Sequence, residues 1–324
     1  MNVKKIIAGL TILLAFTTSV FAKAKKSDKA NGKLKVVTTI FTEYDWTREI
    51  LGDKASNVEL TLLLGNGVDL HSYQPSIQDI AKISTADIFI YVGGESDGWV
   101  EGVLQTANNA GLKTINLLET LGDLAKAEEI VEGMEHGHDE EDEDEAENDE
   151  HVWLSLRNAQ VLCRAIAQAL SEIDPESAGV YEANLAAYEE QLAALDRSFE
   201  EAVDAAAFKT VLFGDRFPFR YLMDDYGITY YAAFSGCSAE TEASFQTIVF
   251  LAGKVDELGL PAVLTIENPK ARIAETIVAS TKTKDQKILA MDSMQSVTAQ
   301  GVQSGAKYLA LMENNLKTLT EALN

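Results

Sequence analysis

The longest uninterrupted helical pattern in the sequence covers residues 176–206. Apolar side chains recur there at spacings of three and four, and no proline interrupts the stretch. This spacing is typical of an amphipathic helix. A helix of roughly 30 residues is about 45 Å long at 1.5 Å per residue. We therefore expect a rigid linking helix within 174–206 that extends from one folded lobe to another, which suits a chain of 324 residues.

Strand-like and helical segments alternate on both sides of this helix. The strand-like segments are 35–41, 58–64, 88–92 and 112–117 in the first block, and 210–214, 229–234, 262–266 and 287–290 in the second. The helical segments are 42–51, 76–84, 97–107 and 156–173, and then 219–225, 244–258, 271–280 and 306–323. Such alternation predicts parallel sheets covered by helices. The expected fold is α/β, with two Rossmann-like lobes of parallel sheet at 34–173 and 207–324 joined by the long rigid helix.

The first 22 residues have the pattern of a secretory signal peptide. Lys4 and Lys5 precede an apolar stretch of 16 residues, and Val20-Phe21-Ala22 offers a cleavage site. A membrane anchor is the alternative, but spanning a bilayer takes about 20 apolar residues. We predict a signal peptide at 1–22 and a flexible lead-in at 23–33. The mature chain is then periplasmic or otherwise secreted, without direct membrane insertion.

The charge balance narrows the range of partners. The chain has 27 Lys plus Arg against 51 Asp plus Glu, a formal net charge of -24. This argues against nucleic acid as a partner, because phosphate contacts need a basic face. It favours cations instead. Twelve of the acids lie in 132–150 together with His136 and His138. We predict a disordered acidic loop there, in which the two histidines are candidates for metal capture; a merely solvated acidic loop is the alternative.

The other two histidines lie at places where a ligand could bind. His71 follows the predicted strand 58–64, and His151 comes directly after the acidic loop. Loops at the carboxyl ends of strands bind ligands in open α/β sheets. Imidazole is a ligand for zinc, and also for copper, iron and nickel. The sequence therefore predicts a metal site that includes His71 and His151.

Several motifs resemble those of the solute-binding proteins of zinc and manganese ABC transporters, the metal-binding cluster A-I family. They are GVDLHSYQPS at 67–76, ADIFIYVGGES at 86–96, DEHVWLS at 149–155, YYAAFSGCSAETEAS at 230–244 and YLALMENNLKTLTEAL at 308–323. The acidic segment before HVWLS resembles the zinc branch. The resemblance implies two lobes bridged by a rigid helix, with a metal ion in the cleft between them. It also implies His71, His151 and Asp292 as ligands.

The resemblance also implies a His or Glu ligand from the second lobe, and here the chain departs from the family. Two ways of matching the motifs place that ligand at Gly214 or at Arg216. Neither residue can bind a metal ion, since glycine has no side chain and arginine no acceptor. Cys237 is a candidate replacement, because thiolate suits zinc; it could equally be a small residue in a turn. Glu267, at the end of strand 262–266, is a further candidate ligand, as are Glu240 and Glu242.

These observations favour an extracytoplasmic Zn²⁺-binding protein that delivers metal to the membrane permease of an ABC transporter. We expect a monomer and no enzymatic activity. Manganese or iron is the alternative cargo within the same transporter class. An exported zinc hydrolase is a second alternative, but it would need an open coordination position and a general base, and no HExxH motif is present. A role in cell adhesion is a third.

Overall fold

The structure is a computed structural model that describes residues 32–135, 147–238, 242–267 and 271–324. The predicted signal peptide, most of the predicted lead-in, and His136 and His138 of the acidic loop lie outside these residues. So does Glu240. Residues Lys33–Asn324 form one unit.

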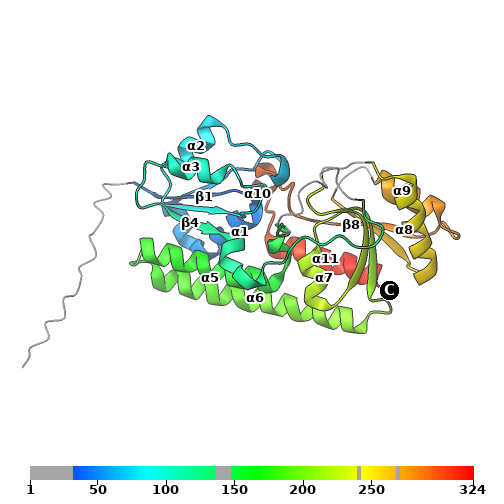
Figure 1. Cartoon of the computed structure of the whole chain (residues 1–324). Helices are drawn as coiled ribbons and strands as arrows, with labels where there is room; N and C mark the ends of the chain where they lie inside the picture. Colours follow the sequence, from blue (N-terminus) through cyan, green and yellow to red (C-terminus); the bar gives the residue numbers. More distant parts are fainter. Residues whose placement is uncertain (1–31, 136–146, 239–241, 268–270) are drawn as a thin grey trace, which may run out of the picture. The chain divides into compact units, whose positions relative to one another are not determined.

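The first sheet has four parallel strands in the order β2-β1-β3-β4 (Figure 1). The strands are β1 (Leu34–Thr38), β2 (Val58–Leu62), β3 (Ile88–Tyr91) and β4 (Lys113–Asn116). The helices of this part are α1 (Phe41–Leu51), α2 (Ile77–Ser84), α3 (Val100–Gln105), α4 (Leu117–Leu121) and α5 (Leu156–Ile173). Ile88, Phe89 and Ile90 are fully buried in β3, because a central strand of a parallel sheet is covered on both faces.

The second sheet repeats this arrangement with the order β6-β5-β7-β8, again fully parallel. Its strands are β5 (Thr210–Phe217), β6 (Thr229–Ser235), β7 (Ala262–Ile266) and β8 (Lys287–Met291). The accompanying helices are α7 (Arg220–Tyr226), α8 (Phe245–Leu258), α9 (Arg272–Ser280), α10 (Ala299–Gln303) and α11 (Tyr308–Ala322). The matching strand orders confirm the predicted α/β fold with two lobes of one architecture.

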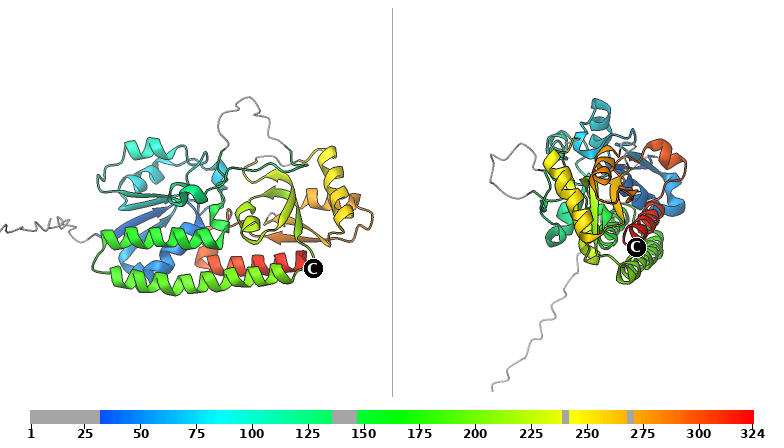
Figure 2. Two further views of the ribbon diagram at one scale, coloured as in Figure 1. Left: turned by 60° about the horizontal axis from the view of Figure 1, so that its bottom comes forward. Right: turned by 90° about the vertical axis from the view of Figure 1, so that its right-hand side faces the viewer.

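Helix α6 (Ala178–Ala205) is the predicted linking helix, with 28 residues. It packs against α1 and α5 beside the first sheet and against α7 and α11 beside the second, and Figure 2 shows it extending along both. Tyr188, Leu192 and Phe199 are buried on its inner face. Because this one helix packs against both lobes, it fixes the distance between them along the helix axis.

The carboxyl-terminal helix α11 begins beside the first lobe and runs back to the second, where the carbonyl of Leu323 accepts the N–H of Phe208 at 3.0 Å. The backbone N–H of Tyr308 donates to Asp45 Oδ2 at 2.8 Å, and its hydroxyl donates to the carbonyl of Trp153 at 2.7 Å. Both Trp153 and Tyr308 are fully buried. These bonds tie the start of α11 to α1 and to the segment that follows His151.

The two ends of the acidic segment that the structure describes, at Glu135 and Asn148, pair with different parts of the chain. Glu135 forms a parallel bridge with Phe234 of β6, and its N–H donates to Ala233 at 3.0 Å. Asn148 pairs with Ala127. The chain entering the acidic segment is thus fixed to the second lobe.

No helix of the described residues combines the length and apolar character that crossing a membrane requires.

Each predicted strand has an observed counterpart, and so does each predicted helix. Two helices were not predicted, α4 and α10, each of five residues. A helix of five residues completes little more than one turn, so it shows no apolar periodicity. The prediction for β5 ended at Gly214, whereas the strand continues to Phe217.

Candidate metal centre

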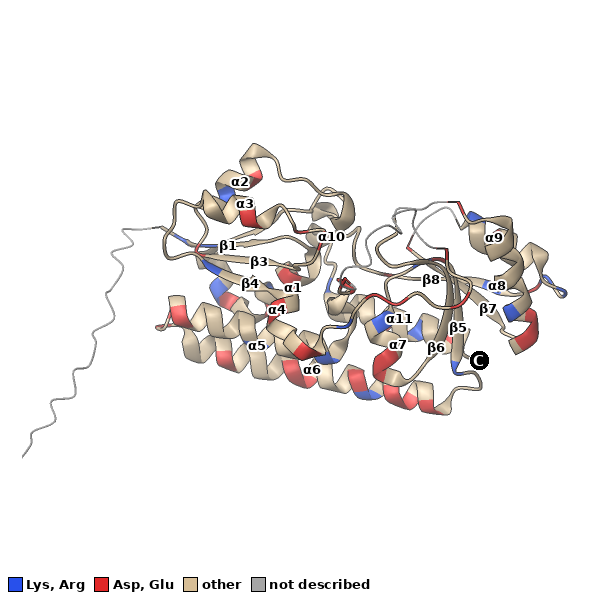
Figure 3. Cartoon of the chain, viewed as in Figure 1, with Lys and Arg blue, Asp and Glu red and all other residues tan. Residues whose placement is uncertain are grey.

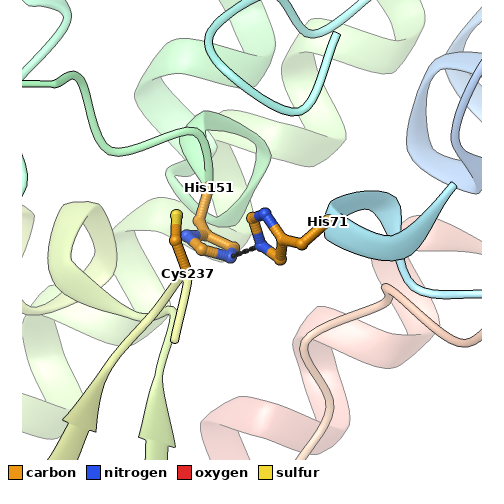
Figure 4. A group of neighbouring side chains, drawn as sticks. All are labelled: His71, His151 and Cys237. Atoms are coloured by element: carbon orange, nitrogen blue, oxygen red, sulfur yellow. Dashed lines mark hydrogen bonds between the residues drawn. The ribbon is translucent and has the colours of Figure 1, made fainter. Parts of the chain in front are cut away.

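Three side chains from both lobes lie close together. His71, His151 and Cys237 each offer one ligand atom, and these three atoms all lie within 4.8 Å of one another (Figure 4). His71 is in a short 3₁₀ turn, Leu70–Ser72, that follows β2. His151 directly precedes the 3₁₀ turn Val152–Leu154, and Cys237 is in the loop after β6. The structure thus brings together both predicted histidines and the predicted cysteine.

The ring of His71 is held from its Nδ1 side. Nδ1 lies 2.7 Å from the hydroxyl of Ser96 and 3.4 Å from Oε2 of Glu150. Ser96 is itself fixed, because its N–H donates to Oε1 of Glu150 at 2.9 Å. Asp69 caps the turn by accepting the N–H of His71 at 3.1 Å. These contacts leave Nε2 as the free ring nitrogen.

His151 is held in the same way by one carboxylate. Oδ1 of Asp149 lies 2.9 Å from Nδ1 of His151 and accepts its backbone N–H at 2.9 Å. His151 is fully buried and Asp149 is 2% exposed. A carboxylate at Nδ1 keeps the ring proton there and turns the lone pair of Nε2 outward.

The two free nitrogens face each other. Nε2 of His71 lies 3.2 Å from Nε2 of His151 (Figure 4). Asp149 favours the proton of His151 on Nδ1, and the His71 tautomer with its proton on Nδ1, toward Ser96 and Glu150, leaves Nε2 of both rings open to a cation. Burial, and then the neighbouring His151, lower the pKa of His71 to about 4. Near neutral pH His71 is therefore unprotonated and can offer a ring nitrogen to a cation.

Cys237 completes the group as a free thiol. Its backbone N–H donates to Oε1 of Glu128 at 3.3 Å. Burial, followed by the charges of Glu128, Glu150 and Asp149, raises the pKa of the thiol far above its usual range. A thiolate here needs a cation beside it. The second cysteine, Cys163, is fully buried in α5 and serves as a core residue.

The structure distinguishes the two positions at which the family's second-lobe ligand was expected. Gly214 lies against α9, where a Cβ atom would be 2.6 Å from Cα of Ala274. Arg216 lies on the side of the metal centre, and its Nη2 donates to Oδ2 of Asp69 at 2.8 Å. The departure that borders the site is therefore Arg216, which forms an ion pair with Asp69 and has no acceptor atom for a metal ion.

Asp292 and Glu267 are not members of this group of three, and both form hydrogen bonds with the segment that follows β8. Glu267 accepts hydrogen bonds from the N–H and hydroxyl of Ser293, both at 2.8 Å, and from the hydroxyl of Ser296 at 2.9 Å. Asp292 accepts the N–H of Met294 at 2.8 Å, and burial, then the charge of Glu267, raises its pKa to about 6. Their roles as ligands stay predictions. Glu242 is exposed.

The residues that hold the two rings were not predicted. The sequence predicts Asp149 and Glu150 as part of the acidic loop, whereas both are only 2% exposed in the structure. Their position directly before His151 was the available signal, because a carboxylate two residues before a histidine can reach its Nδ1. Ser96 is remote in sequence from His71, and no local pattern connects them.

Two lobes of like topology, one helix packed on both, and a His-His-Cys group between them give the chain the architecture of a metal solute-binding protein of an ABC transporter. The family model described as "Zinc-uptake complex component A periplasmic" matches residues 36–322, and the chain belongs to this family.

Individual relatives agree with this assignment. The chain is 34% identical over 313 residues to the zinc-binding lipoprotein AdcA of Streptococcus pneumoniae serotype 4, a match that covers 96% of this chain and 60% of AdcA. It thus spans about 60% of the length of this relative. The metal ABC transporter substrate-binding lipoprotein FimA of Streptococcus parasanguinis is 30% identical over 327 residues, with 99% of both chains covered.

A solved structure shares the fold as well. The Zn(II)-bound ZnuA-like domain of Streptococcus pneumoniae AdcA superposes with a TM-score of 0.70 at 30% sequence identity. The match covers 90% of this chain and 99% of that domain. The chain therefore resembles one domain of AdcA over the whole length of that domain.

Proposed function

We propose that this protein binds Zn²⁺ outside the cytoplasm and delivers it to the permease of an ABC transporter. The observation that carries the proposal is the 3.2 Å approach of the Nε2 atoms of His71 and His151, with both Nδ1 atoms held on the far side. Two imidazoles on one tetrahedral zinc ion, at about 2.0–2.1 Å each, place their nitrogens about 3.3 Å apart. The pair thus has the spacing of two zinc ligands.

Cys237 supplies the third donor in this proposal. Zinc bound to its sulfur would stabilise the thiolate that burial and the nearby carboxylates disfavour. Zinc prefers four ligands, so water or a carboxylate takes the fourth position. Asp292 and Glu267 are the predicted carboxylates for that position.

The donor set favours zinc over manganese. Two imidazoles and a thiol are softer donors than the carboxylates and carbonyls that suit manganese. The name of AdcA points the same way, since that relative is described as zinc-binding, whereas FimA is described only as a metal ABC transporter substrate-binding lipoprotein. The role in transport is proposed from these names and from the family. Binding and release without chemistry on the ligand is the function that follows, and not catalysis.

The acidic character of the chain supports capture of a cation. Figure 3 shows acidic residues along α6 and α7, and the whole sequence has 51 acids against 27 Lys plus Arg. Such an excess raises the local concentration of cations. We propose that the acidic loop with His136 and His138 contributes to metal capture before the ion reaches His71 and His151.

The test is a zinc titration of the purified protein against a chelator of known affinity, with manganese titrated in parallel. We expect one tight zinc ion, lost in His71→Ala and in His151→Ala and weakened in Cys237→Ser. Cys163→Ala is the matched cysteine control and should bind zinc as wild type does. Tight manganese binding with weak zinc binding, or zinc affinity unchanged in both histidine variants, would contradict the proposal.

A further inference from the structure

Arg216 lies between the two loops that carry the candidate ligands. Its Nη2 donates to Oδ2 of Asp69 at 2.8 Å, and its Nη1 contacts the carbonyl of Ser238 at 3.5 Å. Asp69 belongs to the first lobe, whereas Ser238 belongs to the second. One guanidinium group therefore contacts both sides of the metal centre.

Each of these partners is next to a candidate ligand. Asp69 accepts the N–H of His71 at Oδ1, 3.1 Å away, and uses its other oxygen for Arg216. Ser238 directly follows Cys237. Through these two contacts, Arg216 connects the turn of His71 with the loop of Cys237.

The strand that carries Arg216 is irregular at this point. The pairing of β5 with β6 shifts register between Phe213 and Arg216. A bulge of this kind redirects the following side chain. The side chains of Arg216 and Asp69 are only 21% and 26% exposed, so the ion pair is partly shielded from water.

We propose that Arg216 is a positioning residue that clamps the His71 turn to the Cys237 loop, so that ligands from both lobes are already arranged before metal binds. The inference rests on the proposed function, because it concerns the same site. Ligands that are arranged in advance need less ordering when the metal ion arrives, which raises affinity. Arginine suits this task because its planar fork reaches two acceptors at once.

Electrostatics alone would give the opposite result. Arg216 is a positive charge near a cation site, and its removal would raise zinc affinity if repulsion dominated. The ion pair with Asp69 offsets that charge, so we expect the loss of the clamp to dominate. The direction of the affinity change therefore separates the two effects.

The experiment compares Arg216→Gln, Arg216→Lys and Asp69→Asn with wild type by zinc titration against a chelator. We expect zinc affinity to fall about 10- to 100-fold in Arg216→Gln, as it does when partners that orient metal ligands are removed. Arg216→Lys should also weaken binding, because one ammonium group cannot contact both loops. Arg164→Gln is the matched control, since Arg164 pairs with Glu189 at 2.5 Å on the helices α5 and α6.

Cobalt(II) gives a readout that a general loss of stability would not change. Bound to wild type, Co²⁺ should show the thiolate-to-metal charge-transfer band of Cys237, which Cys237→Ser removes. Arg216→Gln saturated with Co²⁺ should show a weaker band, because the Cys237 loop is released. If Arg216→Gln fails to fold, Arg216→Lys and Asp69→Asn carry the same test.

Two outcomes would overturn the inference. Unchanged or higher zinc affinity in the Arg216 and Asp69 variants, with a full cobalt–thiolate band, would exclude a clamp and leave the proposed zinc site intact. Failure of the wild-type protein to bind zinc would overturn the proposed function and the clamp together.

Discussion

Gly236 lies directly against the ring of His151. A Cβ atom at position 236 would be 2.8 Å from Cε1 and 3.0 Å from Nδ1 of His151, and 3.0 Å from the carbonyl oxygen of Phe217. His151 cannot move away freely, because its Nδ1 is bound to Asp149 at 2.9 Å and the residue is fully buried. Only glycine lets the backbone next to Cys237 approach the imidazole this closely.

Gly236→Ala should therefore weaken zinc binding while the protein stays folded. The added methyl group has to displace either the His151 ring or the loop that carries Cys237. We expect zinc affinity to fall about 10-fold or more, in the range seen when ligand orientation is disturbed. Gly253→Ala is the control, since a Cβ atom there meets nothing within 4 Å, and alanine is the better helix former. Equal zinc affinity in both variants would mean that the close contact is not needed for binding.

Asp149 should matter through the hydrogen bond to His151. Asp149→Ala removes the acceptor at Nδ1, so the ring loses its fixed tautomer and orientation. We expect zinc affinity to drop about 10- to 100-fold. Asp149→Asn retains a carbonyl oxygen that can accept the Nδ1 proton, so its loss should be smaller. Titration of both variants against the same chelator checks this order, and a larger loss in Asp149→Asn would contradict it.

The fold was predictable because its signals are local. Periodic apolar spacing over 28 residues defines α6, and unbroken apolar runs such as that of β3 define buried strands. The outline of the metal centre was also predictable, because the sequence places His71 in the loop after a predicted strand and His151 directly after the acidic loop. What could not be predicted depends on contacts between remote segments. The Ser96–His71 bond and the Arg216–Asp69 pair join residues 25 and 147 positions apart, and no sequence period reports such contacts.

Gly214 should be required for packing and not for metal binding. A Cβ atom there would be 2.6 Å from Cα and 2.9 Å from Cβ of Ala274 in α9. Gly214→Ala therefore forces α9 away from β5, and overpacking of this kind costs about 1–3 kcal/mol of unfolding free energy. Urea denaturation of the metal-free protein measures the loss. Gly179→Ala, in the open first turn of α6, should show no such loss. A stable Gly214→Ala variant would mean that α9 yields without cost.

The buried carboxyl of Glu43 predicts a pH dependence of stability that does not involve the metal centre. Glu43 is fully buried in the first turn of α1, where it accepts the backbone N–H of Thr39 at 2.8 Å. Burial, and then the charge of Asp97, raises the pKa of Glu43 to about 8, from 4.5 for an unperturbed glutamate. The folded state therefore holds this proton between about pH 4.5 and pH 8, whereas the unfolded chain has released it.

It follows that the free energy of unfolding should decrease as the pH rises through this window. The contribution of Glu43 is at most about 1.4 kcal/mol per pH unit, the value for one proton. Glu43→Gln has a neutral side chain of the same shape that does not titrate. The free energy of unfolding of this variant should therefore fall less steeply as the pH rises. Urea denaturation with a chelator present, at pH 5, 6, 7 and 8, measures the slopes. Glu59→Gln, at an exposed position of β2, should follow the wild-type slope. Parallel curves for wild type and Glu43→Gln would show that Glu43 ionises alike in both states, so that its hydrogen bonds outweigh the cost of burying its charge.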